Sequence, residues 1–391
     1  MRWWLAVLPL LLLACAPPTS KTTDLQGWAK VPLRYATSFE LWVKGSERLV
    51  LVHGHGGIPD TAGVYHLSPS SAFAATPFTA QRLSLPAKRI ALLSTTHVPF
   101  LAAVGARNTM VATAIAVEVR DTVVQAALRS GQIKDLGSSE ALDRETLIAL
   151  RPDVVLVYPF SGQGATALKG AGLSVVQVSE YLEEHPLGRA EWLRFFGVLT
   201  GHEREADSLF TGIADRYEAL AARAEMYSVR PTVFFGSQWN GQWSVPPGNS
   251  YMARLIADAG GRYVFADRTA SGNIELDTET LIATLSKVDV WGMIGYVDGE
   301  PNEKAFTNGD DRLANIRAVK QRQLFIGNSR TADLFGKALL EPDLILAELR
   351  QLIDPHLVVE HPLDYRPRYF DRPYGPLVAP KIGTLQFAPV Q

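Results

Sequence analysis

Cysteine is nearly absent from this chain, and so is any excess of charge of one sign. The 391 residues contain one cysteine, which excludes a framework of disulfide bonds within the chain. Lysine and arginine total 38 and aspartate and glutamate 40, so the net charge is -2. Because nucleic-acid binding needs a basic surface, we predict no nucleic-acid partner. A hydrophobic fraction of 47% excludes wholesale disorder and suits one large or two medium domains.

Signatures of the common enzyme classes are also missing. The sequence contains no phosphate-binding P-loop, no HExxH zinc motif and no GxGxxG nucleotide fingerprint. Residues 235–239, Phe-Gly-Ser-Gln-Trp, lack the glycine spacing of a nucleophile elbow. A Ser-His-Asp group assembled only in space would leave no signature, so an enzyme stays the main rival class. We predict that the protein is not an enzyme.

The single cysteine, Cys15, ends an apolar run at the N-terminus. Arg2 precedes residues 5–13, which are apolar but too few to span a bilayer. Residues 12–15, Leu-Leu-Ala-Cys, resemble the lipobox of bacterial lipoproteins, which implies cleavage before Cys15 and lipid attachment to its thiol. The alternative is an ordinary secretory signal with a chance cysteine. We predict a signal peptide over residues 1–14, a tether over 15–32, and a lipid-anchored protein in the periplasm or at the cell surface.

The rest of the chain changes in pattern along its length. Short alternating runs predict a β-rich extension over residues 33–87. From residue 88, buried strands alternate with helical stretches, which favours parallel sheets covered by helices. We expect α/β lobes over residues 88–186 and 230–361 and a helical region over 187–229, whose main helix runs from about residue 203 to 226. Residues 362–391 are Pro-rich and predict an extended tail.

An internal repeat links the two predicted lobes. Residues 142–149, LDRETLIA, recur as residues 276–283, LDTETLIA, with seven of eight positions identical. Asp143 and Asp277 suit helix N-caps, and Glu145 and Glu279 suit the first helical turn. The alternative is chance, since helix starts commonly carry such acids. Chance does not explain why the acids occupy equivalent places in both halves. The repeat therefore favours two lobes of similar architecture.

In order and spacing, these segments resemble the class III periplasmic substrate-binding proteins of ABC importers, which capture ferric siderophores, haem or cobalamin. The resemblance covers residues 89 to 357, and its motifs are residues 89–96, 104–106, 136–138, 143–145, 150–155, 186–192, 249–253 and 258–261. It implies an α/β fold in which two Rossmann-like lobes are bridged by a single long α-helix, with the ligand in the cleft between them. The β-rich N-terminal extension lies outside the resemblance.

The resemblance also implies a function. The protein would capture an iron complex, a ferric siderophore or haem, and deliver it to an ABC permease dimer with its ATPase. Cobalamin is the alternative cargo, and a surface lipoprotein without a transport role is the alternative class. Glu145 and Glu279 match the positions that dock onto arginines of the two permease subunits, whereas the alternative is a solvated charge at each helix start. We expect a monomer with no resident cofactor.

Ligand contacts are expected in the loops at the carboxyl ends of the parallel strands. These loops combine aromatic and polar side chains with one arginine, which suits a bulky, flat, partly anionic ligand. The predicted ligand-binding residues are Thr95, Thr96, His97, Tyr158, Phe160, Tyr181, Trp239, Trp243, Tyr296 and Arg330.

Alternatives remain open for several of these residues. Trp239 and Trp243 could instead pack in the core, and Arg330 could pair with a nearby carboxylate rather than with an anionic ligand. His97 could be an axial haem ligand, or a loop histidine that only forms hydrogen bonds. His53 and His55 lie in a Gly-rich turn of the extension, and the cleft residues lack the histidine cluster that zinc requires, so we predict no metal site.

Overall fold

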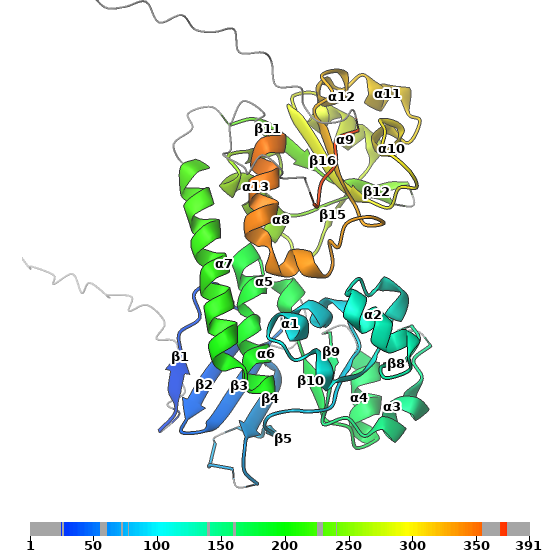
Figure 1. Cartoon of the computed structure of the whole chain (residues 1–391). Coiled ribbons are helices and arrows are strands. Elements are labelled where there is room, and N and C mark those ends of the chain that lie inside the picture. Colours follow the sequence, from blue (N-terminus) through cyan, green and yellow to red (C-terminus); the bar gives the residue numbers. More distant parts are fainter. Residues whose placement is uncertain are drawn as a thin grey trace, which may run out of the picture.

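The computed structural model describes residues 25, 27–54, 61–71, 73–76, 78–138, 141–158, 162–224, 230–239, 241–353 and 368–373. These residues form two α/β lobes, stacked one above the other in Figure 1, with helices along one side and a separate β-sheet beside the lower lobe. The predicted signal peptide, Cys15 and most of the predicted tether lie outside the described residues.

The N-terminal lobe is built on a five-stranded parallel sheet with the order β10-β9-β6-β7-β8. Its strands are β6 (Ile90–Leu92), β7 (Met110–Thr113), β8 (Lys134–Asp135), β9 (Val154–Val157) and β10 (Val175–Gln177). Its helices are α1 (Val98–Ala103), α2 (Thr122–Arg129), α3 (Arg144–Leu150) and α4 (Gly162–Gly170). Every residue of β6 and β9 is buried, as expected for a parallel sheet covered on both faces.

The C-terminal lobe has a four-stranded parallel sheet with the order β14-β11-β16-β17 and a small antiparallel sheet with the order β12-β13-β15. Its strands are β11 (Thr232–Phe235), β12 (Ser237–Trp239), β13 (Gln242–Val245), β14 (Arg262–Tyr263), β15 (Ile274–Leu276), β16 (Val290–Gly295) and β17 (Leu324–Asn328). Its helices include α8 (Tyr251–Asp258), α9 (Thr278–Leu285), α10 (Lys304–Thr307), α11 (Asp311–Ala314) and α12 (Arg317–Lys320).

The lobes are joined by helices α5 (Pro186–Glu191), α6 (Leu193–Thr200) and α7 (Glu203–Ala224). Helix α7 has 22 residues, or about 33 Å, and runs alongside both lobes in Figure 1. Gly201 separates it from α6 with a left-handed backbone conformation. Helix α13 (Pro342–Ile353) packs beside α7, where Arg216 Nε lies 2.6 Å from Asp343 Oδ2. The predicted α/β fold with a long bridging helix is confirmed.

The extension forms a five-stranded sheet that starts earlier in the chain than predicted. Its strands are β1 (Ala29–Val31), β2 (Phe39–Lys44), β3 (Glu47–His53), β4 (Thr61–Ser68) and β5 (Gln81–Ser84), in that order across the sheet. Strand β1 lies within the residues that we predicted as a tether. These residues are ordered because they pair antiparallel with β2. One face of the sheet joins the main core through Phe39, Val50 and Tyr65. Trp28 and Leu49 belong to a small cluster of their own.

Two buried carboxylates fasten the extension to the linker helices. Glu191 in α5 accepts hydrogen bonds from the backbone N–H groups of residues 34–36 at 2.8 to 2.9 Å. Glu183, just before α5, accepts the N–H groups of Thr37 and Ser38, each at 2.9 Å. Backbone N–H groups that donate to a carboxylate form strong, charge-assisted hydrogen bonds. These contacts seat the extension on the lobe and on the linker together.

Each outer strand of the two parallel sheets is short or covered. The backbone N–H of Gln177 in β10 donates to the Tyr65 hydroxyl of the extension at 2.8 Å. At the other end of the same sheet, β8 has only two residues, both charged. In the C-terminal lobe, Asp371 pairs with Ile326 of β17 through two backbone hydrogen bonds, and β14 has two residues. Residues 368–373, the described part of the predicted tail, therefore pack on the C-terminal lobe.

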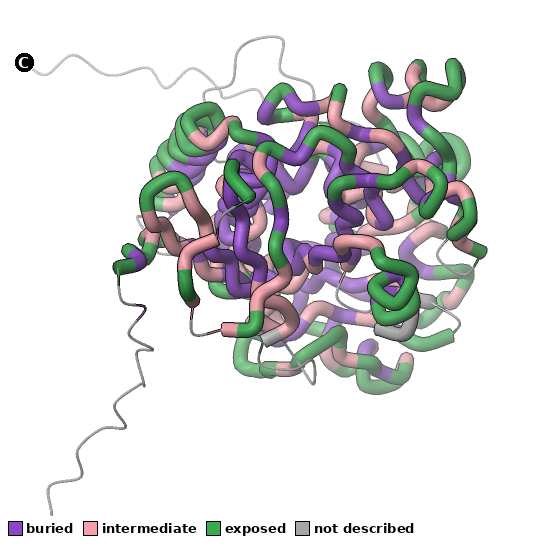
Figure 2. The backbone as a smooth tube through the Cα atoms, turned by 90° about the horizontal axis from the view of Figure 1, so that it is seen from below, coloured by how far each residue is buried: buried purple, intermediate pink, exposed green. Residues whose placement is uncertain are grey.

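One main hydrophobic core runs through the extension, the linker helices and both lobes. Figure 2 shows the buried stretches of backbone gathered in the interior and the exposed stretches around the outside. A second core, which includes Leu93, Ala112 and Val155, lies within the N-terminal lobe. In the part of the chain that the structure describes, no helix is both long and apolar enough to cross a membrane.

Candidate ligand-binding cleft

Two cavities lie between the lobes and meet at Leu334 and Phe335, which line both of them. We call the first the α7 compartment: its volume is about 760 Å³, and its walls come from α1, α7 and the segment after β17. We call the second the α8 compartment: its volume is about 660 Å³, and its walls come from residues 181–184, the start of α8 and the small sheet. Together they form a cleft to which both lobes contribute.

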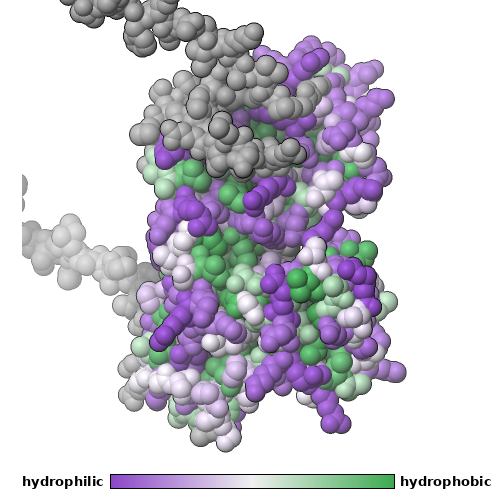
Figure 3. Space-filling view, in the orientation of Figure 1, coloured by the Kyte–Doolittle hydropathy of each residue, from purple (hydrophilic) through white to green (hydrophobic). Residues whose placement is uncertain are grey.

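The α7 compartment has an apolar interior. Its walls include Val98, Pro99 and Ala102 of α1 and Leu209 and Ile213 of α7. Figure 3 shows hydrophobic side chains gathered between the two lobes on this face of the molecule. This surface can bind an apolar or aromatic group by removing it from water.

Charged side chains at the edge of the α7 compartment are largely paired. Arg107 Nη2 lies 2.7 Å from Asp121 Oδ2, and Arg216 pairs with Asp343. Arg120 instead donates from Nη2 to the backbone oxygen of Ser329 at 2.8 Å. Because Arg120 belongs to the N-terminal lobe and Ser329 to the C-terminal lobe, this contact crosses the cleft.

The α8 compartment combines aromatic rings and neutral hydrogen-bonding groups with three charged side chains, Glu183, Glu184 and Arg189. Its lining includes Thr96, Tyr181, Arg189, Ser237, Asn249, Tyr251 and Asn273. Ser250 caps α8 by accepting the N–H of Ala253 at 3.2 Å, which fixes the neighbouring residues. Asn249 Nδ2 donates to Glu184 Oε1 at 2.7 Å, a second contact that crosses the cleft.

A buried pair lies beneath the cleft floor. Thr96 Oγ1 donates to Glu180 Oε1 at 2.5 Å, and His97 Nε2 lies 3.7 Å from Glu180 Oε2. The side chains of His97 and Glu180 are both completely buried. Burial raises the pKa of Glu180, but the interactions with His97 and Thr96 outweigh it, so the pKa lies below its usual range. His97 therefore supports the floor in this conformation and does not face the cleft as the sequence predicted.

Four of the predicted ligand-binding residues line the cleft. Thr95 and Tyr296 line the α7 compartment, and the Tyr296 side chain is 69% exposed. Thr96 and Tyr181 line the α8 compartment. Tyr158 is half-buried and lines neither compartment. Phe160 and the side chain of Trp239 lie outside the described part of the structure.

Trp243 and Arg330 take the alternative roles that the sequence left open. Trp243 is 1% exposed and packs in the core with its ring centroid 5.6 Å from that of Trp291. It points inward because side chains alternate along β13, with Trp243 and Val245 buried and Gln242 and Ser244 at least partly exposed. Arg330 pairs with Asp298 and lies over the Tyr296 ring, with 5.9 Å between its guanidinium carbon and the ring centroid. Neither side chain lines the cleft in this conformation.

The structure adds cleft residues that the sequence did not single out. Arg189 and Asn249 belong to motifs that carried the family resemblance, so their segments were recognised. The sequence did not show that their side chains face the cleft. Arg120 and Phe335 belong to loops without a periodic pattern, and no signal in the sequence could have found them. Among the residues that the structure describes, no three His, Cys, Asp or Glu side chains are grouped so that they could hold a metal ion.

The internal repeat has the same local structure in both lobes. Asp143 Oδ1 accepts the N–H of Thr146 at 2.9 Å, and Asp277 Oδ1 accepts the N–H of Thr280 at 2.7 Å. These backbone hydrogen bonds hold the pKa of both aspartates below the usual range. Each cap starts a helix, α3 in the N-terminal lobe and α9 in the C-terminal lobe.

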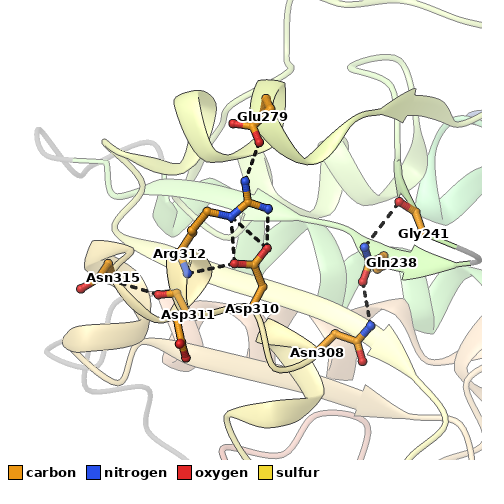
Figure 4. A network of polar contacts seen from close by, with 8 residues as sticks. All are labelled: Gln238, Gly241, Glu279, Asn308, Asp310, Asp311, Arg312 and Asn315. Atoms are coloured by element: carbon orange, nitrogen blue, oxygen red, sulfur yellow. Dashed lines mark hydrogen bonds and ion pairs between the residues drawn. The ribbon is translucent and has the colours of Figure 1, made fainter.

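The glutamates of the repeat lie in the first turns of these two helices. Glu145 is exposed, and no described residue forms an ion pair with it. The Glu279 side chain is 79% exposed and pairs with Arg312, which also pairs with Asp310 (Figure 4). Both carboxylates are thus accessible at the surface, one on each lobe.

Comparison with known proteins agrees with this architecture. The sequence profile of the family described as "Periplasmic binding protein" matches residues 90–331. An uncharacterized lipoprotein of Methanocaldococcus jannaschii is 26% identical over 70% of this chain, and the match spans 66% of that relative's length. A periplasmic haem-binding protein of Pseudomonas aeruginosa is similar in structure, with a TM-score of 0.54, 21% identity and coverage of 69% of this chain and 94% of that one.

A second solved structure, from an ABC-type Fe³⁺-hydroxamate transport system of Saccharomonospora viridis, has a TM-score of 0.53 and 23% identity. It covers 69% of this chain and 94% of that one. At these identities the two structures show a shared fold. The family profile covers more than half of this chain, and both solved structures share its overall fold. The chain belongs to the periplasmic binding proteins and is of the class III type.

Proposed function

We propose that this protein is a substrate-binding lipoprotein of an ABC importer and that it captures an iron complex, a ferric siderophore or haem, between its lobes. The observation that carries the proposal is the pair of compartments, of about 760 and 660 Å³, to which both lobes contribute. Volumes of this size suit a ligand larger than a bare ion or a single amino acid. Tyr181, Tyr251 and Phe335 offer aromatic surface to a flat or bulky cargo.

The membrane attachment rests on the sequence and on a relative. Leu12, Leu13 and Ala14 precede Cys15 as in a lipobox, and the Methanocaldococcus jannaschii relative is named as a lipoprotein. A lipid on Cys15 would hold the protein at the outer side of a membrane, beside a permease dimer and its ATPase. Glu145 and Glu279 are suited to that partner, because a carboxylate in the first turn of a helix is a pre-oriented acceptor for a guanidinium group.

A ligand titration tests the proposal. The chain from residue 16 onward would be titrated with a ferric hydroxamate siderophore, iron(III) protoporphyrin IX and cobalamin, with tryptophan fluorescence and calorimetry as readouts. We expect saturable binding of one iron complex with a dissociation constant of about 1 μM or tighter. If cobalamin alone bound tightly, the proposed cargo would change to cobalamin and the proposed transport role would stand. Absence of binding by all three would contradict the proposal and favour a surface lipoprotein without a transport role.

A further inference from the structure

Exposed apolar side chains are concentrated around one opening of the cleft. Among the residues that the structure describes, the large hydrophobic side chains that are exposed are Val117, Val123, Ile148, Leu209, Tyr296 and Phe335. Leu209, Tyr296 and Phe335 line the α7 compartment, and Val117 and Val123 adjoin residues 118–121, which also contribute to its walls. Apolar surface that is gathered in one place marks a site that a ligand or a partner covers.

The rest of the apolar wall of this compartment is aliphatic. Val98 of α1, Leu193 of α6 and Ile213 of α7 line it, and all three are buried. The aromatic side chains that line it in the described structure, Tyr296 and Phe335, are both exposed. A wall of aliphatic side chains binds a hydrocarbon chain by removing it from water and places no demand on its direction.

The charges at the α7 compartment balance one another. Equal numbers of cationic and anionic side chains line it. Arg107 is paired with Asp121, and Lys337 Nζ lies 2.9 Å from Glu341 Oε1. An ionic group on a ligand would have to displace these partners, whereas an uncharged group leaves them in place. The compartment therefore suits a neutral, apolar group.

The two compartments of the cleft differ in chemistry but are continuous. Leu334 and Phe335 are the lining residues that they share. On the α8 side, Thr96, Ser237 and Asn273 offer hydrogen-bonding groups. A compact polar complex would fill the α8 compartment and leave the apolar walls of the other in water. A ligand with a polar part and an apolar part would cover both.

We infer that the cargo is amphiphilic, with an iron-binding head in the α8 compartment and a hydrocarbon arm, of the acyl-chain class, in the α7 compartment. The inference rests on the proposed function and narrows the iron complex to one that carries such an arm. Leu209 and Ile213 then contact the arm from the bridging helix. Helix α7 would thus take part in the choice of cargo as well as in joining the lobes.

A matched pair of probes tests for the arm. Both probes are a ferric trihydroxamate siderophore, whose terminal amine carries an acetyl group in one and an octanoyl group in the other. Calorimetry measures both affinities at concentrations at which the octanoyl probe does not self-associate. Each buried CH₂ group is worth up to about fourfold in affinity, and ordering of the chain takes back a part, so we expect the octanoyl probe to bind about fiftyfold or more tightly.

The other outcomes separate this inference from the proposed function. Equal affinities of the two probes would overturn the inference and leave the proposed function intact, with the exposed apolar surface left for a protein partner to cover. If neither probe binds, the inference also falls, and the titration with iron(III) protoporphyrin IX and cobalamin decides the proposed function.

Variants locate the arm in the α7 compartment. Leu209→Asp places a charge in the apolar wall and should lower the ratio of the two affinities to about fivefold or less. Ile148→Asp is the matched control and should keep the wild-type ratio, because Ile148 is 43% exposed, against 40% for Leu209, and lines neither compartment. An unchanged ratio in a folded Leu209→Asp protein would overturn the placement. Tyr296→Ser, at an exposed position of the same compartment, replaces that variant if it does not fold.

Discussion

His185 is a histidine that the fold keeps neutral. Burial and the positive charge of Arg254 lower its pKa from 6.5 to about 4. Its Nδ1 accepts the N–H of Leu187 at 3.0 Å, which only a neutral ring can do, and its ring lies 4.6 Å from that of Tyr35 in the extension. Protonation of His185 would therefore break the cap of α5 and weaken the contact with the extension.

Because of His185, the free energy of unfolding should decrease as the pH is lowered. In the unfolded chain His185 binds a proton near pH 6.5, whereas in the folded chain it does so only near pH 4, so the free energy of unfolding decreases as pH falls through this window. After allowance for solvent screening, the loss is on the order of 2 kcal/mol. His185→Asn keeps a capping side chain and should remove this part of the pH dependence, as measured by urea unfolding at several pH values. His202→Asn is the control, because His202 is half-buried between α6 and α7 and contacts Thr200 rather than α5. An unchanged pH slope in His185→Asn would contradict the assignment.

At the same scale, the sequence located the loops of the cleft better than the side chains that face it. Thr95, Thr96 and Tyr181 follow buried strands, and strand ends can be read from runs of apolar residues. Trp243 could have been placed correctly, because residues 242–245 alternate polar and apolar as a half-buried strand does. The burial of His97 depends on Glu180, more than eighty residues away, and no local pattern encodes such a contact.

Among the elements, helix α5 bears the attachment of the extension. Glu191 is fully buried and accepts three backbone N–H groups from residues 34–36. Glu191→Gln would replace one acceptor oxygen with an amide that faces these donors. We expect a loss of about 2 kcal/mol in the free energy of unfolding, measured by urea denaturation. Glu205→Gln, an exposed acid on α7, is the matched control, and equal stability of the two variants would contradict this account.

The starts of α3 and α9 were predicted from the repeat, and the structure confirms the caps at Asp143 and Asp277. The long helix was also predicted closely, at about residues 203 to 226 against the observed Glu203–Ala224. Strand β1 was not predicted, because three residues carry too little pattern and its partner β2 supplies the order. Elements defined by their own sequence were thus recovered, and those defined by a partner were not.

The same two helix starts carry the predicted docking contacts. Glu145→Ala combined with Glu279→Ala should reduce import by about tenfold or more while cargo affinity stays unchanged, because both carboxylates lie on α3 and α9, outside the cleft. Uptake of radiolabelled iron in cells and titration of the purified variant measure the two quantities. Glu205→Ala with Asp215→Ala removes the same charge from the exposed face of α7 and serves as the control. Normal import by the first double variant would show that docking uses other residues.

At the scale of the whole molecule, the N-terminal extension lies along the bridging helix α7 and contacts it at two points. Arg48 pairs with Glu203 at the start of α7, and Arg34 pairs with Glu218, fifteen residues further along the helix. Two contacts also cross the cleft, Arg120 with Ser329 and Asn249 with Glu184. Because the extension contacts α7 at two points along its length, we expect the helix to bend little and the lobes to separate little.

Cargo binding should therefore change the overall shape little. Small-angle X-ray scattering of the protein with and without saturating cargo should give radii of gyration that agree within error, because α7 and the extension that contacts it limit movement of the lobes. A complex that does not bind is the control for solvent effects. A contraction larger than the measurement error, as hinge closure of two domains around a ligand would produce, would contradict this expectation. The two lobes and their connection were predictable from the sequence. The contacts between the extension and α7 were not, since they join residues more than 150 positions apart.

The outer strands of both parallel sheets have a consequence for how copies of the protein behave toward one another. An exposed sheet edge offers a row of unsatisfied backbone groups onto which a neighbouring chain can add a strand. Here Tyr65 covers β10, Asp371 pairs with β17, and β8 and β14 are two residues long. Among the residues that the structure describes, the outer strands of the two parallel sheets therefore offer little template for strand addition. At these four edges, crowding of the protein on a surface therefore exposes no long strand to a neighbouring copy.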